Sequence, residues 1–245
     1  MTWPLDGRPF DVPVSRELCS GTGALFGGWG LGLLADAAQH TTGRRLRDLS
    51  AAFVRPVTLG SRLSVRCDVL AEGRALAHCR LDAEESGRTA LTATAVVETP
   101  ATSREAAPGE PGALAPRVPG PLECPERSYE SGPGAAMMLD VRVAGRSPGS
   151  ALLWARVLCD VPDEVRLAVV SDHVPYLLRR ILPGRPRVTT VSASLRLFGG
   201  PVAEWVLLDV SLVARAGRIA AGRVSLWQDG DTLAGVAEQT MRLSA

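Results

Sequence analysis

Phe53-Val-Arg-Pro56 and Phe198-Gly-Gly-Pro201 each open a stretch of sequence, and the two stretches follow one pattern. The first continues through the turn sequences Glu72-Gly-Arg74 and Glu85-Ser-Gly-Arg88, and the second through Ala216-Gly-Arg218 and Gln228-Asp-Gly230. Each then enters an alternating run, which ends near Val97 or Met241. The matching phenylalanines are 145 residues apart, and the matching glycines are 144 and 143 apart. This near-constant separation indicates one strand–turn–strand module that is used twice.

The composition excludes several classes of function. The chain has 245 residues and a formal net charge of +1, which gives no electrostatic argument for a nucleic acid or a membrane as partner. Its basic residues are all arginine and it has no asparagine, which we attribute to the codon bias of a GC-rich bacterial genome. The Arg44-Arg45 and Arg179-Arg180 pairs are too short to be basic tracts, and we expect both to be solvated helix ends.

Cysteine usage and the N-terminus predict a cytoplasmic protein. The five cysteines are odd in number and lack Cys-x-x-Cys spacing, which argues against a zinc site and for reduced thiols. Residues 1–10 contain no apolar core of a signal peptide. Nowhere do eighteen apolar residues follow one another, so the sequence predicts no membrane span.

The first half predicts one helix among antiparallel strands. Residues 9–20 are expected to form a strand, and residues 27–42 a helix that buries Leu31, Leu34, Ala35 and Ala38 on one face. Glycine inside a helix costs about 1 kcal/mol relative to alanine, so Gly30 and Gly32 indicate very close packing near the helix start. Further strands are predicted by alternation at 63–70, 75–83 and 89–98.

The second half predicts the same arrangement after a linker. Residues 100–134 are rich in proline and glycine, so we expect modules over 1–99 and 135–245, with residues 104–132 exposed and poorly packed. A central helix is predicted over 165–182, and the strands are expected at 137–144, 151–159, 188–198, 205–214, 219–228 and 232–243. A helix wrapped by a curved sheet, twice, is an α+β fold whose two modules pair edge to edge in one continuous sheet.

These segments resemble the type II acyl-CoA thioesterases of bacteria and peroxisomes, a family with a double hot-dog fold. The first half matches at Gly27-Gly28-Trp-Gly-Leu-Gly32, at Ala37-Ala38 and at Phe53-Val-Arg-Pro56. The second half matches at the following four segments: Leu167-Ala-Val-Val-Ser-Asp172, Thr190-Val-Ser-Ala-Ser194-Leu195, Glu204-Trp-Val-Leu-Leu208 and Glu238-Gln239-Thr-Met-Arg242. The resemblance covers residues 9–99 and 136–243.

The resemblance implies hydrolysis of an acyl-CoA thioester without a metal or organic cofactor, at one site per chain. Asp172 would take a proton from water, while Thr190 and Gln239 hold that water by hydrogen bonds. The residues themselves add two supports: Asp172 lies close to the apolar stripe of its helix, and a buried Gln239 amide must find partners. A homo-oligomer of double hot-dog subunits is compatible with the resemblance.

Three departures from the family bear on the substrate and on the alignment. The stretch before Phe53 has no histidine, and Phe198-Gly-Gly-Pro201 replaces a longer aromatic segment, which favours an acyl group other than a plain fatty chain, such as one from specialised metabolism. In a rival alignment Glu238 takes the place of Gln239.

Two other classes of function stay open: a non-catalytic protein that binds acyl thioesters, and a hot-dog dehydratase or hydratase. The dehydratase chemistry needs a histidine paired with a carboxylate, and therefore needs His40 or His173 in the pocket. His173 is expected to point away from Asp172, its direct neighbour on the predicted helix. Asp36 is expected to form a salt bridge between the modules, and Gly27-Gly28 is expected to permit tight packing or to belong to a degenerate first-half site.

Overall fold

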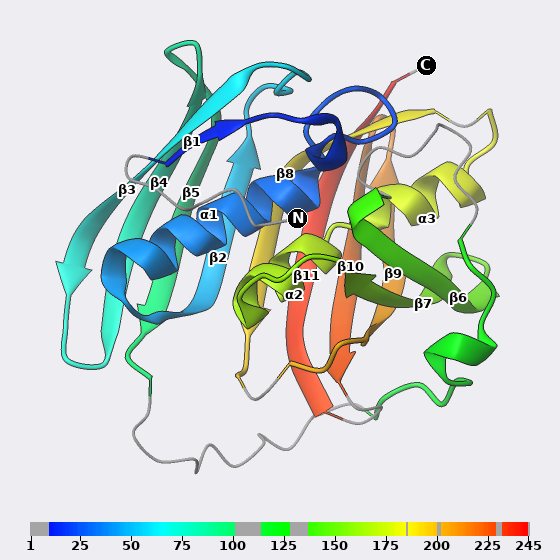
Figure 1. Cartoon of the computed structure of the whole chain (residues 1–245). Coiled ribbons are helices and arrows are strands. Elements are labelled where there is room, and N and C mark those ends of the chain that lie inside the picture. The colour runs from blue at the N-terminus through cyan, green and yellow to red at the C-terminus, as the bar shows by residue number, and fades with distance from the viewer. Residues whose placement is uncertain are drawn as a thin grey trace.

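The computed structural model describes residues 10–100, 114–127, 137–184, 186–199, 202–228 and 232–244. Within these residues, eleven strands form one antiparallel sheet in the order β1-β3-β4-β5-β2-β8-β11-β10-β9-β7-β6. The helices α1, α2 and α3 lie on one side of this curved sheet (Figure 1). None of the described helices has the length and apolar character of a membrane span.

The first half of the chain builds one half of the sheet around α1. Its elements are β1 (Phe10–Pro13), α1 (Gly27–Thr42), β2 (Arg45–Phe53), β3 (Arg62–Glu72), β4 (Leu76–Glu85) and β5 (Arg88–Glu98). The predicted helix over 27–42 is confirmed, and it ends at Gly43, whose left-handed backbone (φ 68°) lets its N–H bond to the Gln39 carbonyl. The expected strand over 9–20 is wrong beyond Pro13, where the pairing with β3 ends and a short 3-10 turn follows.

The second half contains the elements β6 (Leu139–Ser147), β7 (Ser150–Val157), α2 (Asp163–Val170), α3 (Val174–Ile181), β8 (Arg187–Leu197), β9 (Val206–Ala216), β10 (Ile219–Gln228) and β11 (Thr232–Ser244). The prediction of one central helix over 165–182 is wrong, because the helix is broken at residues 171–173. Pro175 explains the break: it has no N–H to bond the Ser171 carbonyl, and its ring would clash with that carbonyl in a continuous helix. The freed Ser171 carbonyl accepts the His173 N–H at 3.0 Å instead.

The two halves share one sheet and one core. β2 pairs with β8 in an antiparallel register that sets Ser50 opposite Ser194 and Ala51 opposite Ala193. On the helix side, α1 packs against α2, and the buried side chains of both halves form one continuous apolar cluster. The expected pairing of two modules into one sheet is confirmed, and the β2–β8 contact is the seam between them.

Part of the predicted linker packs on the second half of the chain. Residues 115–124 cover an apolar patch on the outer face of the second half, made of Trp154, Leu207 and Trp227. The Trp154 indole donates to the Pro119 carbonyl at 2.9 Å, and Cys124 is buried. The expectation of an exposed and poorly packed segment over 104–132 is therefore wrong for the residues that pack on this patch, such as Val118 and Cys124, while Leu114 and Leu122 are exposed as expected. Residues 101–113 and 128–136 lie outside the described residues. Proline-rich chain can cover a sheet face because packing there needs no regular backbone.

Candidate active site

The carboxyl group of Asp172 lies in the break between α2 and α3 and is only 4% exposed. The Gln239 amide on β11 donates to it, and the Thr190 hydroxyl on β8 and the Gly28 N–H at the start of α1 lie close enough to act on it. Burial raises the pKa of Asp172 above its usual value, while these hydrogen bonds and the charge of Arg179 oppose the shift. The structure thus brings together Asp172, Thr190 and Gln239, the residues that the sequence predicts.

Gln239 is held in one orientation by two hydrogen bonds. Its side-chain Oε1 accepts the Val174 N–H at 3.1 Å, so that its Nε2 faces Oδ1 of Asp172 and donates to it. A flipped amide would lose both bonds, because a carbonyl cannot donate and an amide nitrogen cannot accept. Gln239 is 2% exposed, whereas Glu238 is exposed on the opposite face of β11. The rival placement at Glu238 is therefore incompatible with this site.

Thr190 reaches the site because β8 is irregular. The pairing of β8 with β11 shifts between Thr240 and Met241, so Val191 is skipped and Thr190 lies opposite Met241. Without this bulge, Thr190 would share the outer face with Ser192, since successive strand residues alternate. With the bulge, Thr190 points inward and Thr189 is exposed, an example of a bulge that re-aims a side chain at a functional position.

The start of α1 forms part of the same site. A Cβ on Gly27 would collide with Oδ2 of Asp172, and a Cβ on Gly28 would collide with the Val169 carbonyl in α2. The two glycines therefore permit close contact, as expected, but their N–H groups lie beside Asp172 and not in a degenerate first-half site. Sequence reasoning favoured packing for Gly27-Gly28 over a role for their N–H groups, although a glycine pair at the positive end of a helix also signals a place for an anion.

The histidines and Asp36 lie outside this constellation. His173 is 1% exposed, its Nδ1 lies 2.9 Å from the Val170 carbonyl, and its ring packs edge-on to Phe26. Burial and the charge of Arg127 lower the pKa of His173 to about 3, so the ring is neutral. His40 is exposed and packs against Phe10 near the far end of α1, and Asp36 is partly buried on the same helix.

The same positions in the first half are apolar. The two halves are related by an approximate two-fold rotation about the Ser50–Ser194 pair, which makes Leu49 on β2 the equivalent of Ala193 on β8. Ala95, the β5 partner of Leu49, is then the equivalent of Gln239, the β11 partner of Ala193. By the same rotation, Leu46 on β2 is the equivalent of Thr190. Even the bulge is repeated, between Leu46 and Asp48. Leu46 and Ala95 offer no side-chain hydrogen bond, so the duplicated fold carries a single polar constellation.

Asp172 lies on the helix side of the sheet, between α2 and α3. A groove of about 590 Å³ crosses the outer face, lined in part by the exposed residues Ser50, Thr94 and Glu238. The side chains of these residues point away from the helices, and therefore away from the buried carboxyl. Asp172 is almost sealed from solvent and does not line this groove.

Comparisons with solved structures find the same architecture elsewhere. A candidate thioesterase from Novosphingobium aromaticivorans is 29% identical, with a TM-score of 0.85 over 96% of this chain and 95% of that chain. A candidate thioesterase II from Thermobifida fusca is 18% identical, with a TM-score of 0.81 over 100% and 96%. A hot-dog protein from Alicyclobacillus acidocaldarius is 19% identical, with a TM-score of 0.80 over 98% and 95%. The last two show the fold alone. No curated protein matches the chain.

Family comparison covers nearly the whole chain. The acyl-CoA thioesterase N-terminal domain matches residues 15–97, and the acyl-CoA thioesterase C-terminal domain matches residues 98–243. The boundary between the two matches lies at the last residue of β5, so the segment that covers Trp154 falls within the C-terminal match. With a hot-dog fold and these two adjacent domains, the chain belongs to the acyl-CoA thioesterase family.

Proposed function

We propose that this protein hydrolyses an acyl-CoA thioester to the free acid and CoA, with water activated by Asp172. The observation that carries the proposal is the buried Asp172 carboxyl, to which Gln239 donates and beside which Thr190 and the start of α1 lie. A carboxylate has about four lone-pair sites; Gln239 donates to one of them, and even if Thr190 and Gly28 each took another, one would remain. The remaining site can accept a proton from one water molecule, and a raised pKa makes the carboxylate a better base at neutral pH.

The reaction needs few groups. Asp172 takes a proton from water, and the oxygen of that water attacks the thioester carbonyl to give a tetrahedral intermediate. The positive end of α1 and the Gln239 amide lie beside Asp172 and are placed to stabilise the developing oxyanion. Collapse of the intermediate breaks the C–S bond, and the proton held by Asp172 passes to the departing thiolate.

The acyl group is proposed to be other than a plain fatty chain, such as one from specialised metabolism. This rests on the absence of histidine in Arg47–Phe53 and on the short segment after Phe198. A panel of acyl-CoA substrates, scored by thiol release, tests the function and the acyl group together. Straight fatty acyl-CoAs should turn over more slowly than branched or aromatic ones. Absence of thiol release across a broad panel would contradict the proposed hydrolysis and favour a non-catalytic protein that binds acyl thioesters. Loss of a β-hydroxyacyl substrate without thiol release would indicate a dehydratase.

We expect Gln239→Ala and Thr190→Val each to lower kcat roughly 10- to 100-fold, more than they raise KM, because each removes a hydrogen bond to a charged group. The losses should be non-additive with Asp172→Asn, since all three residues act on one water molecule. Glu238→Ala is the matched control, because Glu238 faces the other side of β11. Steady-state kinetics of the single and double variants check this; additive losses would show that the residues do not share a water.

The pH dependence follows from the raised pKa of Asp172. Asp172 must be ionised to act as a base, so kcat/KM should fall as the pH drops through its folded-state pKa. That acid limb should lie clearly above the value of about 3.9 found for a free aspartate. A pH–rate profile between pH 4 and 8 measures it. A flat profile down to pH 4 would contradict both the burial effect and the role of Asp172.

A further inference from the structure

One buried side chain beside the candidate active site has a polar atom without a partner. His173 follows Asp172 in the break between α2 and α3, and its side chain is 1% exposed. Among the residues that the structure describes, no hydrogen-bond partner reaches its Nε2. An unpaired polar atom in a protein interior is costly, and native proteins keep few of them. This nitrogen is therefore a candidate for contact with a ligand.

The chemistry of this nitrogen follows from the other side of the ring. His173 Nδ1 lies 2.9 Å from the Val170 carbonyl, which can only accept a hydrogen bond, so Nδ1 carries the hydrogen. Burial and the charge of Arg127 lower the pKa of His173 to about 3, so Nε2 keeps its lone pair at neutral pH. A nitrogen with so low a pKa is a weak base for proton abstraction. Its lone pair is suited instead to accepting a hydrogen bond.

The start of α1 connects His173 to the Asp172 carboxyl. The His173 ring packs edge-on to Phe26, with the ring centroids 6.4 Å apart. The edge of the Phe26 ring lies against Gly28, where it would meet a Cβ at 2.5 Å, and the Gly28 N–H lies beside Asp172. Phe26 is partly exposed, whereas Asp172 and His173 are buried. A ligand with its reacting carbonyl at Asp172 would therefore reach His173 by extending along Phe26.

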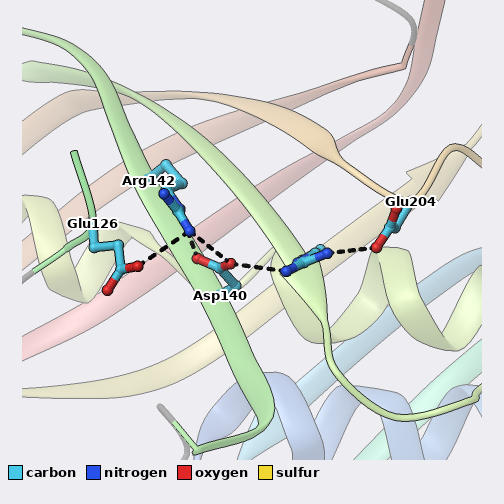
Figure 2. Close-up of polar contacts among 5 residues, drawn as sticks. Glu126, Asp140, Arg142 and Glu204 are labelled. Atoms are coloured by element: carbon cyan, nitrogen blue, oxygen red, sulfur yellow. Dashed lines mark hydrogen bonds and ion pairs between the residues drawn. The ribbon is translucent and has the colours of Figure 1, made fainter. Parts of the chain in front are cut away.

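A positive charge is held beside the His173 ring. Glu126 pairs with Arg142 at 3.2 Å, as Figure 2 shows, which anchors the chain next to Arg127. The Arg127 guanidinium lies over the Tyr176 ring of α3, 4.3 Å from its centroid. The Tyr176 N–H donates to the His173 carbonyl at 3.2 Å, so the two residues belong to the same turn. Arg127 thus adds a positive charge next to the acceptor nitrogen.

We propose that His173 is a specificity residue whose Nε2 accepts a hydrogen bond from a hydroxyl on the acyl group. This inference rests on the proposed hydrolysis of an acyl thioester at Asp172, and it narrows the acyl group to one that carries a hydroxyl near the thioester. The charge of Arg127 favours a hydroxyl over an N–H group, because a hydroxyl can donate to Nε2 and turn its oxygen toward that charge. Since Nε2 is sealed by packing, the proposal includes that the Phe26 ring turns aside as the acyl group enters.

Such a contact would separate two kinds of substrate. A plain fatty acyl chain would leave Nε2 of His173 unpaired in the complex, whereas a hydroxyl would satisfy it. A site that hydrogen-bonds a substrate hydroxyl rejects the analogue that lacks it, because a buried polar group of the site is then left without a partner. His173 thus supplies a reason for an acyl group other than a plain fatty chain that is independent of the segment after Phe198.

The test compares pairs of acyl-CoAs that differ only in the hydroxyl. Each hydroxyacyl-CoA, with its hydroxyl at successive carbons along the series, is measured beside its deoxy analogue of the same length. At one position the wild type should prefer the hydroxyacyl-CoA in kcat/KM by roughly 10- to 100-fold, and His173→Phe should lose most of this preference. Phenylalanine keeps the ring and removes both nitrogens. His78→Phe makes the same change at an exposed position on β4 and should keep the preference.

His173→Asn separates the two nitrogens of the ring. Its amide N–H can still donate to the Val170 carbonyl, but no atom of asparagine replaces Nε2. We expect it to lose the preference for the hydroxyl as His173→Phe does. The readout is a ratio of two substrates on one variant, so a general loss of stability or of active protein cancels from it.

Three outcomes would overturn the inference. A wild type without preference at any hydroxyl position is the first. The second is an equal loss on both members of each pair in His173→Phe, which would indicate a structural role such as holding an enclosed water at Nε2. The third is a preference that His173→Asn retains, which would assign the effect to Nδ1.

Failure of the proposed hydrolysis can be told apart from failure of this inference. Thiol release with an unchanged preference in the variants would contradict the role of His173 and leave the hydrolysis standing. If the wild type releases no thiol, the hydrolysis fails, and calorimetric titration with the same pairs of acyl-CoAs decides the role of His173. Tighter binding of the hydroxyacyl-CoA that is lost in His173→Phe would support it, and equal binding of the two would contradict it.

Discussion

Asp172→Asn is expected to lower kcat roughly 10²–10⁴-fold, the contribution typical of a positioned general base. Asparagine keeps the shape of the side chain but cannot take a proton from water. KM should change little, because the proposed role of Asp172 concerns the water and not the CoA or acyl group. Single-turnover and steady-state rates on the best acyl-CoA would measure the loss. A rate within a few-fold of the wild type would remove Asp172 from the mechanism.

The same variant has an expected signature in stability. The pKa of Asp172 is raised in the folded state, so the folded protein binds this proton more tightly than the unfolded chain does. The stabilising effect of that proton is complete below the unfolded pKa and is lost as the pH rises through the folded pKa. Asparagine does not titrate, so the free energy of unfolding of Asp172→Asn minus that of the wild type should increase as the pH rises through that window. Denaturant unfolding at several pH values checks the sign, and a difference independent of pH would contradict it.

Gly28→Ala is the second change with a large expected effect. Alanine favours a helix over glycine by about 1 kcal/mol, but the new Cβ would collide with the Val169 carbonyl in α2. Backbone cannot move aside as a side chain does, so we expect a net destabilisation of about 1–3 kcal/mol, with Tm lower by roughly 2–4 °C per kcal/mol. Separation of α1 from α2 would also withdraw the Gly28 N–H from Asp172, so kcat should fall as well.

Gly30→Ala provides the matched control. It lies on the same helix, and the nearest atom to its Cβ would be the end of the flexible Leu91 side chain at 3.0 Å, with Phe53 and Leu25 at ordinary contact distances of 3.5 and 3.7 Å. The gain in helix propensity should then offset the crowding, and Tm and kcat should stay near those of the wild type. Thermal unfolding and thiol release on both variants decide the matter. Equal effects at positions 28 and 30 would show that the helix interior, and not the contact with α2, sets the requirement for glycine.

The elements that sequence predicts well are those with local signals. The helix over 27–42 follows from its apolar spacing and from Gly43 at its end, and the hairpins follow from turn glycines between alternating runs. The residues Asp172, Thr190 and Gln239 were identified through the resemblance to a family. Their own patterns are weak, since a threonine in a strand or an aspartate in a helix is common.

The features that sequence misses depend on contacts between distant segments. Pro175 carried a local signal for the break at 171–173, but the apolar residues on both sides predict one longer helix. The bulge that turns Thr190 inward is visible only in the pairing of β8 with β11. The Gly28 donor belongs to one half of the chain and Asp172 to the other, so no pattern within either half could place them together. The burial of Cys124 likewise depends on tryptophans far along the sequence.

The seam between β2 and β8 has a consequence for how this protein responds to dilution. If the two halves were separate subunits, they would dissociate as the protein concentration falls. A site built from both would then be lost, and the rate per subunit would fall. Here the partners of Asp172 are joined to it by one chain, which holds the halves at an effective concentration in the millimolar range. The rate per molecule should therefore be the same at nanomolar and micromolar protein. The two halves expressed as separate polypeptides should instead show activity that rises with concentration until they reassociate.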